Sequence, residues 1–285
     1  MALKDILVLA DGSVQDASRL DLAADLAQRH EAHLTAAALL EPGPARLSEI
    51  TITPMIGGPV LAELMVRYRH EAAQAAKKLE QLASEAARRS GVPFTWQVID
   101  GNGPAGLASI ARTADLAVLG QPNPDPVGPQ AGWDVVEEVL ISSGRPVLIL
   151  PYAGKFTARF AHVLIGWNGS REGARAVAGA MSLLCGAERV TILGVVAASE
   201  VEPDYLPAGV DLAQHLGRHG IQAEVARSVA GSLASADAIL DFAADCSADL
   251  LVVGAYGQSR LREAVVGGVS RSLLRHQTLP LLMAH

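Results

Sequence analysis

Short apolar runs alternate with longer amphipathic stretches along the whole chain. Runs such as LLVVG are apolar at every position, which is typical of strands buried on both faces of a parallel sheet. The alternation of such strands with helical patterns predicts an α/β fold built from doubly wound parallel sheets. We expect ten strands, at residues 5–10, 33–39, 94–99, 116–120 and 147–150 and, further on, at 162–167, 189–196, 222–228, 250–254 and 281–284.

The second half of the chain repeats the first. DILVLADGS near the start and HVLIGWNGS from residue 162 each join an apolar run to a Gly-Ser turn, and TADLAVLG is similar to SADLLVVG. The repeats predict two domains with five strands each, at 1–152 and 160–285. The offset is 157 residues at the Gly-Ser turns and 134 later, so the first half carries 23 additional residues. We place them at 41–64, a stretch rich in Pro and Gly that predicts a loop re-entering a helix, with the long amphipathic helix itself at 66–89.

Composition narrows the possible functions. Half of the 285 residues are hydrophobic and the net charge is -7, without clustered Lys and Arg, so nucleic acid is not an expected partner. No apolar run approaches the ~20 residues that cross a bilayer, so we expect no membrane partner either. Two cysteines without a CxxC pair indicate a reducing compartment, and the start of the chain lacks the pattern of a signal peptide. We therefore predict a cytoplasmic protein.

The densest glycine pattern follows the strand predicted at 250–254. Glycine lets backbone N–H groups approach a ligand closely, and a helix N-terminus adds unpaired N–H groups and a partial positive charge. The pattern predicts a site for an anion such as phosphate. The alternative is that these glycines only form turns and cap a helix. The residues are Gly254, Gly257 and Gly267, spaced as G-x2-G-x9-G, followed by Gly268, Val269 and Ser270.

This segment resembles the nucleotide-binding signature of universal stress proteins, G-x2-G-x9-G-(Ser/Thr). The Gly-Ser turns and the ADL strands extend the resemblance to both halves, so the chain resembles a tandem universal stress protein. The resemblance implies a stress-response regulator that binds ATP or a related adenine nucleotide, with or without Mg, in its C-terminal domain. It also implies an intramolecular pseudo-dimer that pairs through the terminal strands 147–150 and 281–284. Such a pseudo-dimer can form a further homodimer and can bind a protein partner, whose identity is unknown. The implied ligand contacts are the glycine segment just given for the phosphates and Trp167, Asn168 and Val196 for the nucleoside.

Two positions depart from the family pattern. Gly268 stands where the family has Ser or Thr, so Ser270 must supply any hydroxyl. Asn168 stands where the family has an acidic residue, which weakens a magnesium ligand.

The first half lacks most of the signature. Its equivalents of the three glycines are Gly120, Asn123 and Trp133. We expect Trp133 to fill the phosphate space and Asp134 to repel phosphate at the helix start, which would leave this domain degenerate. We further expect the 41–64 insertion and the proline-rich segment 121–131 to cover the vacant site, an ordinary loop at the domain edge being the alternative.

We identify no catalytic residue and no metal ligand set. No G-x-S-x-G motif is present, and neither cysteine stands in a nucleophile motif. His215 and His219 lie one helical turn apart on a polar face, which favours solvation over metal binding, and GNGPAG (101–106) lacks the acidic residue of a dinucleotide site. Two alternatives remain open: a slow ATPase or phosphotransferase at the same site, and a protein-interaction module without nucleotide.

Overall fold

The computed structural model describes residues 2–39, 58–100, 103–126, 128, 130–197, 209–230, 235–256 and 268–285. The chain divides into two compact units, one of Lys4–Ser143 and one of Gly144–His285 together with Met1–Leu3. Each unit alternates strands with helices, so the predicted α/β fold is confirmed. The boundary falls before the last strand of the first sequence repeat, which belongs to the second unit.

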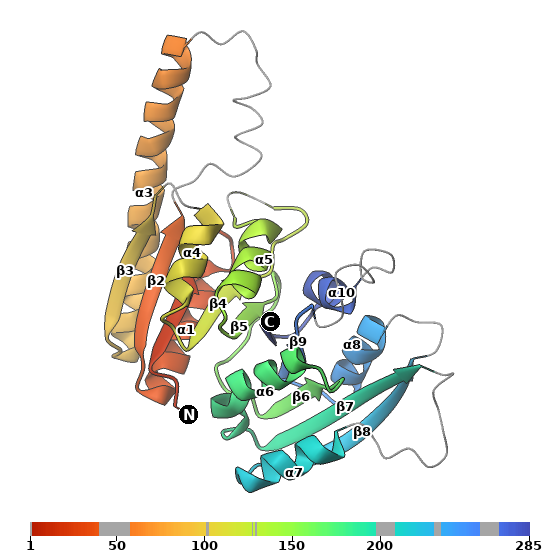
Figure 1. Ribbon diagram of the computed structural model, residues 1–285. Helices are drawn as coiled ribbons and strands as arrows, with labels where there is room; N and C mark the ends of the chain where they lie inside the picture. The colour runs from red at the N-terminus through yellow and green to blue at the C-terminus, as the bar shows by residue number, and fades with distance from the viewer. Residues whose placement is uncertain are drawn as a thin grey trace. The chain divides into compact units, whose positions relative to one another are not determined.

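The first unit holds a parallel sheet in the order β3-β2-β1-β4 (Figure 1). Its strands are β1 (Asp5–Leu9), β2 (His33–Leu39), β3 (Phe94–Ile99) and β4 (Leu116–Gly120). Helix α1 packs against α3, and α4 packs against α5. The strand order reverses between β1 and β4, which is the switch point where such sheets bind ligands. The helices are α1 (Asp16–His30), α3 (Gly58–Ser90), α4 (Gly103–Ala111) and α5 (Trp133–Ser142).

Helix α3 begins earlier than the sequence predicted. Residues 58–64, which we had assigned to the inserted loop, form its first turns. Pro59 is compatible with this start, because proline in the first turn of a helix removes an N–H that has no partner there. The rest of the insertion, residues 41–57, lies outside the described residues, and so does its expected cover over the vacant site.

The second unit holds a sheet in the order β5-β10-β9-β6-β7-β8. Helices α8 and α10 pack against each other, while α6 and α7 cover the opposite face (Figure 1). The strands are β5 (Val147–Leu150), β6 (His162–Gly166), β7 (Arg189–Ala197), β8 (Ala223–Ala230), β9 (Leu250–Gly254) and β10 (Leu281–Ala284). The helices are α6 (Arg171–Leu184), α7 (Val210–Arg218), α8 (Ser235–Asp245) and α10 (Val269–His276).

The terminal strands of the two repeats pair with each other. Strand β5 runs antiparallel to β10, with Leu148 opposite Leu282, and every residue of both strands is buried. The side chain of Gln277 adds a hydrogen bond, its Nε2 donating to the carbonyl of Ile149 at 3.2 Å. The predicted pairing is confirmed, and it removes an apolar edge from each repeat.

The recurring ADL motif has a structural explanation. The carboxylate of Asp115 accepts from the amide of Lys4 at 2.7 Å, and that of Asp249 accepts from the amide of His162 at 2.8 Å. Each aspartate therefore holds the start of the first strand of its repeat, β1 or β6. The motif repeats because the fold repeats, and it carries no functional information by itself.

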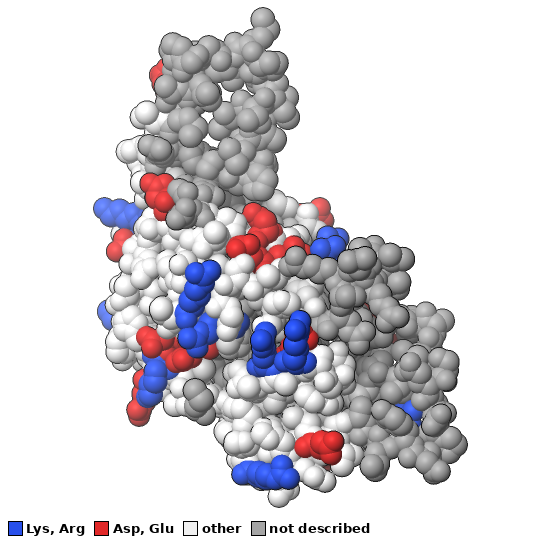
Figure 2. Space-filling view, in the orientation of Figure 1, with Lys and Arg blue, Asp and Glu red and all other residues white. Residues whose placement is uncertain are grey.

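Surface and helix composition give two further observations. Among the described residues, no helix combines the length and the apolar character that a membrane crossing requires. On the face drawn in Figure 2, acidic and basic side chains of the described residues are interspersed rather than gathered into one basic area.

Candidate functional site

The candidate site lies where β6 and β9 end side by side in the second unit. The two strands are parallel neighbours, with Gly166 opposite Val253, and β7 lies on the other side of β6. The strand order reverses between β6 and β9, which makes this the switch point of the sheet. Ligands of doubly wound sheets bind beyond the carboxyl ends of the strands at such a point.

Gly254, the last residue of β9, lies in direct contact with the first turn of α6. A Cβ atom at this position would lie 2.7 Å from the carbonyl carbon of Glu172 and 2.9 Å from the Cα of Gly173. Both distances are shorter than real Cβ contacts, and the neighbouring atoms are backbone. Only glycine therefore allows the end of β9 to meet the start of α6.

The turn between β6 and α6 is closed by side chains. Ser170 is the N-cap of α6, and its hydroxyl accepts from the amide of Gly173 at 3.1 Å. The side-chain oxygen of Asn168 accepts from the amide of Ser170, also at 3.1 Å. Asn168 thus orders the turn, a role that an amide fills as well as a carboxylate does.

Trp167 contacts three elements, namely β7 and the first turns of α6 and α7. Its amide donates to the carbonyl of Leu193 in β7 at 2.9 Å, and its side chain is half-buried. A Cβ atom on Gly173 would lie 3.4 Å from the indole, and one on Gly209, the N-cap of α7, would lie 3.6 Å from it. The indole therefore lies between the first turn of α6 and the start of α7. The equivalent residue of the first repeat is Ala10.

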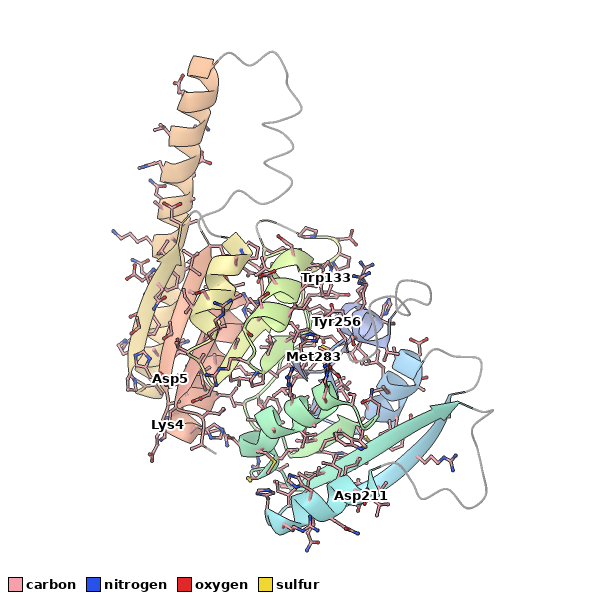
Figure 3. All side chains as sticks on the ribbon, viewed as in Figure 1. Lys4, Asp5, Trp133, Asp211, Tyr256 and Met283 are labelled. Carbon is pink, nitrogen blue, oxygen red and sulfur yellow. The ribbon has the colours of Figure 1, made fainter. Side chains whose placement is uncertain are left out.

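Helix α10 begins at the far end of the glycine segment. Its N-cap is Gly268, no side chain caps its first turn, and that turn has no acidic residue. Ser270 is buried, and its hydroxyl oxygen accepts from the amide of Tyr256 at 3.0 Å (Figure 3 labels Tyr256). Val269 is exposed. N–H groups in the first turn of a helix are the type of donor that binds an anion.

Three of the predicted contacts are only partly observed or lie outside the description. Gly257 and Gly267 lie outside the described residues. Val196 lies in β7, next to the end of that strand, and only its backbone is described. The structure thus brings together Trp167, Asn168 and Gly254, while Gly268 and Ser270 lie at the start of α10.

Glu172 is a site residue that the sequence analysis missed. Its side chain is buried in the first turn of α6, one oxygen accepts from Arg171, and the other has no hydrogen-bond partner among the described residues. Burial disfavours its charge, but the hydrogen bond and the charge of Arg171, a backbone hydrogen bond and the charge of His285 together outweigh this and lower the pKa of Glu172. An acidic residue in the first turn of a predicted helix was the available signal.

The equivalent place in the first unit is occupied by Arg19. A Cβ atom on Gly120, the counterpart of Gly254, would collide with the guanidinium of Arg19, which is 1% exposed. Trp133, which the sequence predicts to fill the phosphate space, lies half-buried at the start of α5. The Asp134 carboxylate lies against Gly132, the N-cap of α5, so a negative charge is placed at this helix start.

The proline-rich segment 121–131 is also anchored. The amide of Asn123 donates to the side-chain oxygen of Gln130 at 3.0 Å, and the side-chain nitrogen of Gln130 donates back to the carbonyl of Asn123 at 2.8 Å. At its end, the amide of Ala131 donates to the carboxylate of Asp11 at 2.9 Å. The segment thus closes on the turn that follows β1. Within the described parts of the chain, no three His, Cys, Asp or Glu side chains gather as a metal site would require.

Comparison with known proteins finds a matching family model and several solved structures with a similar fold. Residues 159–285 match the sequence model of the Universal stress protein family. The chain is similar to a universal stress protein from Archaeoglobus fulgidus DSM 4304, with 16% identity and a TM-score of 0.72 over 98% of this chain and 96% of that one. It is also similar to a functionally unknown protein from Pseudomonas aeruginosa PAO1, with 16% identity and a TM-score of 0.58 over 99% and 92%.

A third solved structure is a universal stress protein from Archaeoglobus fulgidus in complex with dAMP. It is 18% identical over 52% of this chain and 98% of that one, with a TM-score of 0.34, which says nothing about the ligand of this chain. No curated protein is similar enough in sequence to count as a match. The longer matches show that the chain has the fold of universal stress proteins over nearly its whole length.

Proposed function

We propose that the second unit, whose residues 159–285 match the sequence model of the Universal stress protein family, binds one adenine nucleotide, ATP or a close relative. The ligand would lie beyond the carboxyl ends of β6 and β9, with its nucleoside near Trp167 and Asn168. Its phosphates would lie on the glycine segment that runs from Gly254 to Ser270.

The contact of Gly254 with α6 carries the proposal. It brings the end of β9 against the Glu172–Gly173 peptide, so the glycine segment starts directly beside the β6–α6 turn. Backbone without side chains at a switch point is the arrangement that allows a phosphate to approach main-chain N–H groups. A glycine needed only for a turn would not require contact with a second element.

The start of α10 supports the phosphate end of the site. Its first turn has no acidic residue and its N-cap, Gly268, has no side chain, so neither neutralises the positive end of the helix dipole. In the first repeat, Asp134 stands at the position of Gly268 and already provides an anion at the start of α5. We therefore propose one nucleotide site per chain, in the second unit.

We propose a regulatory role for this binding, in a stress response mediated by a partner protein. Nucleotide occupancy would change the surface that the second unit presents to this partner. The test of occupancy comes first, because every regulatory effect depends on it.

Calorimetric titration of the full chain with ATP, ADP and AMP, with and without Mg, tests the proposal. We expect a stoichiometry of one for at least one of these nucleotides. Gly268→Asp should weaken binding by roughly tenfold or more, because a carboxylate would then occupy the anion position at the start of α10. Gly217→Asp, which adds the same charge on the exposed part of α7, is the matched control and should bind as the wild type does.

Two results would contradict the proposal. One is the absence of binding for all three nucleotides in the folded wild-type chain. The other is a stoichiometry of two, or binding unchanged in Gly268→Asp, either of which would remove the assignment to the second unit. Release of inorganic phosphate during the same titration would indicate the slow ATPase instead.

A further inference from the structure

The first unit contains a buried ion cluster at the turn between β1 and α1, whereas the equivalent turn of the second unit is held by Asn168 and Ser170. Arg19 projects from α1, and its Nε donates to the carbonyl of Leu9 at 2.8 Å. Its Nη2 donates to Asp11 at 2.6 Å and also to Asp16. The guanidinium lies against Gly120 at the end of β4. This cluster of Asp11, Asp16 and Arg19 thus fills the switch point of the first sheet.

The cluster contains two carboxyl groups but only one cationic group. Two carboxylates meet a single guanidinium nitrogen, and the side chains of Asp11, Asp16 and Arg19 are 8%, 4% and 1% exposed. With both acids ionised, the largely buried cluster would carry a net negative charge with little contact to solvent. A buried unbalanced charge is costly, and a proton on one carboxyl group removes it.

The groups that face Asp16 do not remove this excess negative charge. Asp11 faces it from the end of β1, and Arg19 faces it from the next turn of α1. The remaining contacts are backbone: the amides of Asp11 and Gly12 donate to Asp16 at 3.2 and 2.6 Å. Beyond Arg19, β4 contributes Gly120.

The pKa values of the two carboxyl groups shift in opposite directions. Burial, with the charge of Asp11 added and that of Arg19 opposing, raises the pKa of Asp16 to about 7. Burial also disfavours the charge of Asp11, but Arg19 and the amide of Ala131 outweigh it and hold the pKa of Asp11 well below its usual range. The two groups titrate as one unit, and that unit keeps a proton into the neutral range.

We propose that the cluster of Asp11, Asp16 and Arg19 is a pH-sensitive latch that fastens the 121–131 segment to the turn after β1. In its protonated form the cluster is neutral, and Asp11 is shared between Arg19 and the amide of Ala131. Loss of the proton sets two buried carboxylates against each other. The turn that carries Asp11 then loosens, and the contact with Ala131 loosens with it.

The direction of the pH effect follows from proton linkage. Between the ordinary pKa of an aspartate and about 7, the folded unit binds more protons at Asp16 than the unfolded chain does. The stabilisation from this proton is therefore present at low pH and is lost as the pH rises towards and through 7. Asp11 acts below this window, because its folded pKa lies under the unfolded value.

Hydrogen exchange of the Ala131 amide in the full chain tests the latch. Its protection factor, corrected for the intrinsic pH dependence of exchange, should fall by roughly tenfold between about pH 6 and pH 8, since one pH unit above a pKa near 7 favours the ionised form tenfold. Asp16→Asn removes the titrating group and should abolish this fall. Asp25→Asn, an exposed aspartate of the same helix that accepts from Ser90, should leave it unchanged.

Carboxyl NMR titration of the wild-type chain provides a second measurement, in case Asp16→Asn fails to fold. An aspartate that titrates above about pH 6 supports the latch. Titration of every aspartate below about pH 5 would overturn it, and so would a pH-dependent protection of Ala131 that persists in folded Asp16→Asn. The latch does not depend on nucleotide binding in the second unit, so the two proposals can fail separately.

Discussion

The backbone amide of Tyr256 donates a hydrogen bond to the hydroxyl oxygen of Ser270, 3.0 Å away. These two residues flank the part of the glycine segment that lies between β9 and α10. Tyr256 has a left-handed backbone conformation, with φ of 56°, and Ser270 is buried. Ser270 therefore ties the two ends of the segment together, while its hydroxyl proton remains available for donation to a ligand.

Ser270→Ala should loosen this tie. The Tyr256 amide would lose the hydroxyl acceptor of this part-buried hydrogen bond, and the loss of such a bond costs about 0.5–1.5 kcal/mol. We expect a lower melting temperature and weaker nucleotide binding than in the wild type. Ser272→Ala, which removes a hydroxyl that contacts His276 in the same helix, is the matched control. Equal melting temperatures for the two variants would show that the Tyr256–Ser270 bond contributes no stability.

Gly254→Ala should separate the end of β9 from α6. The added methyl group would meet the Glu172–Gly173 peptide, and overpacking of this kind costs about 1–3 kcal/mol. We expect lower stability in urea unfolding together with weaker nucleotide binding. Gly217→Ala provides the comparison, since a Cβ there meets nothing within 4 Å. Its stability should be equal to or slightly above that of the wild type, because alanine favours helix. A fully stable Gly254→Ala would mean that the two elements can move apart freely.

Arg19→Met should destabilise the first unit strongly. The variant leaves two buried carboxylates without their cation, and breaking a buried ion pair in this way costs about 3–5 kcal/mol. The loss should be smaller at low pH, where the carboxyl groups take up protons. Arg89→Met removes an exposed partner of Asp21 and should cost no more than about 1 kcal/mol. Similar losses in both variants, measured by urea unfolding at two pH values, would contradict the importance of the buried cluster.

Most of the strands could be predicted from the sequence because they are apolar runs with polar or turn residues at both ends, whereas β3 (FTWQVI) and β8 (AEVARSVA) carry polar residues within the strand. Strand β9, LLVVG, is buried at four of its five positions, as a run without alternation suggests. The start of α3 was misplaced because Gly58 and Pro59 look like a break, although proline is acceptable at the beginning of a helix. Local composition alone does not distinguish a loop from the first turn of a helix.

The role of Arg19 was harder to foresee. It is in helical register with Ala23 and Leu26, on the buried face of α1, where a lone arginine would be very costly. The signal was the pair of aspartates, Asp11 after the strand and Asp16 three residues before Arg19, which can neutralise such a residue. The contact between Arg19 and Gly120 joins segments a hundred residues apart, and only the folded sheet brings them together.

Trp167 provides the most direct optical test of the nucleoside end of the site. Its indole lies between α6 and α7 at the end of β6, where the first repeat has Ala10. If the base lies against this ring, ATP should quench or shift its fluorescence, measured in a chain with Trp96→Phe and Trp133→Phe. In the wild-type background, Trp167→Ala should weaken binding by roughly tenfold, because stacking of a base on an aromatic ring contributes about 1–3 kcal/mol. Trp167→Phe should retain most of the affinity, since it keeps an aromatic face. Loss of binding in both variants would instead indicate that the indole holds the turns between β6, α6 and α7 in place. Unchanged binding in Trp167→Ala would place the base elsewhere in the second unit.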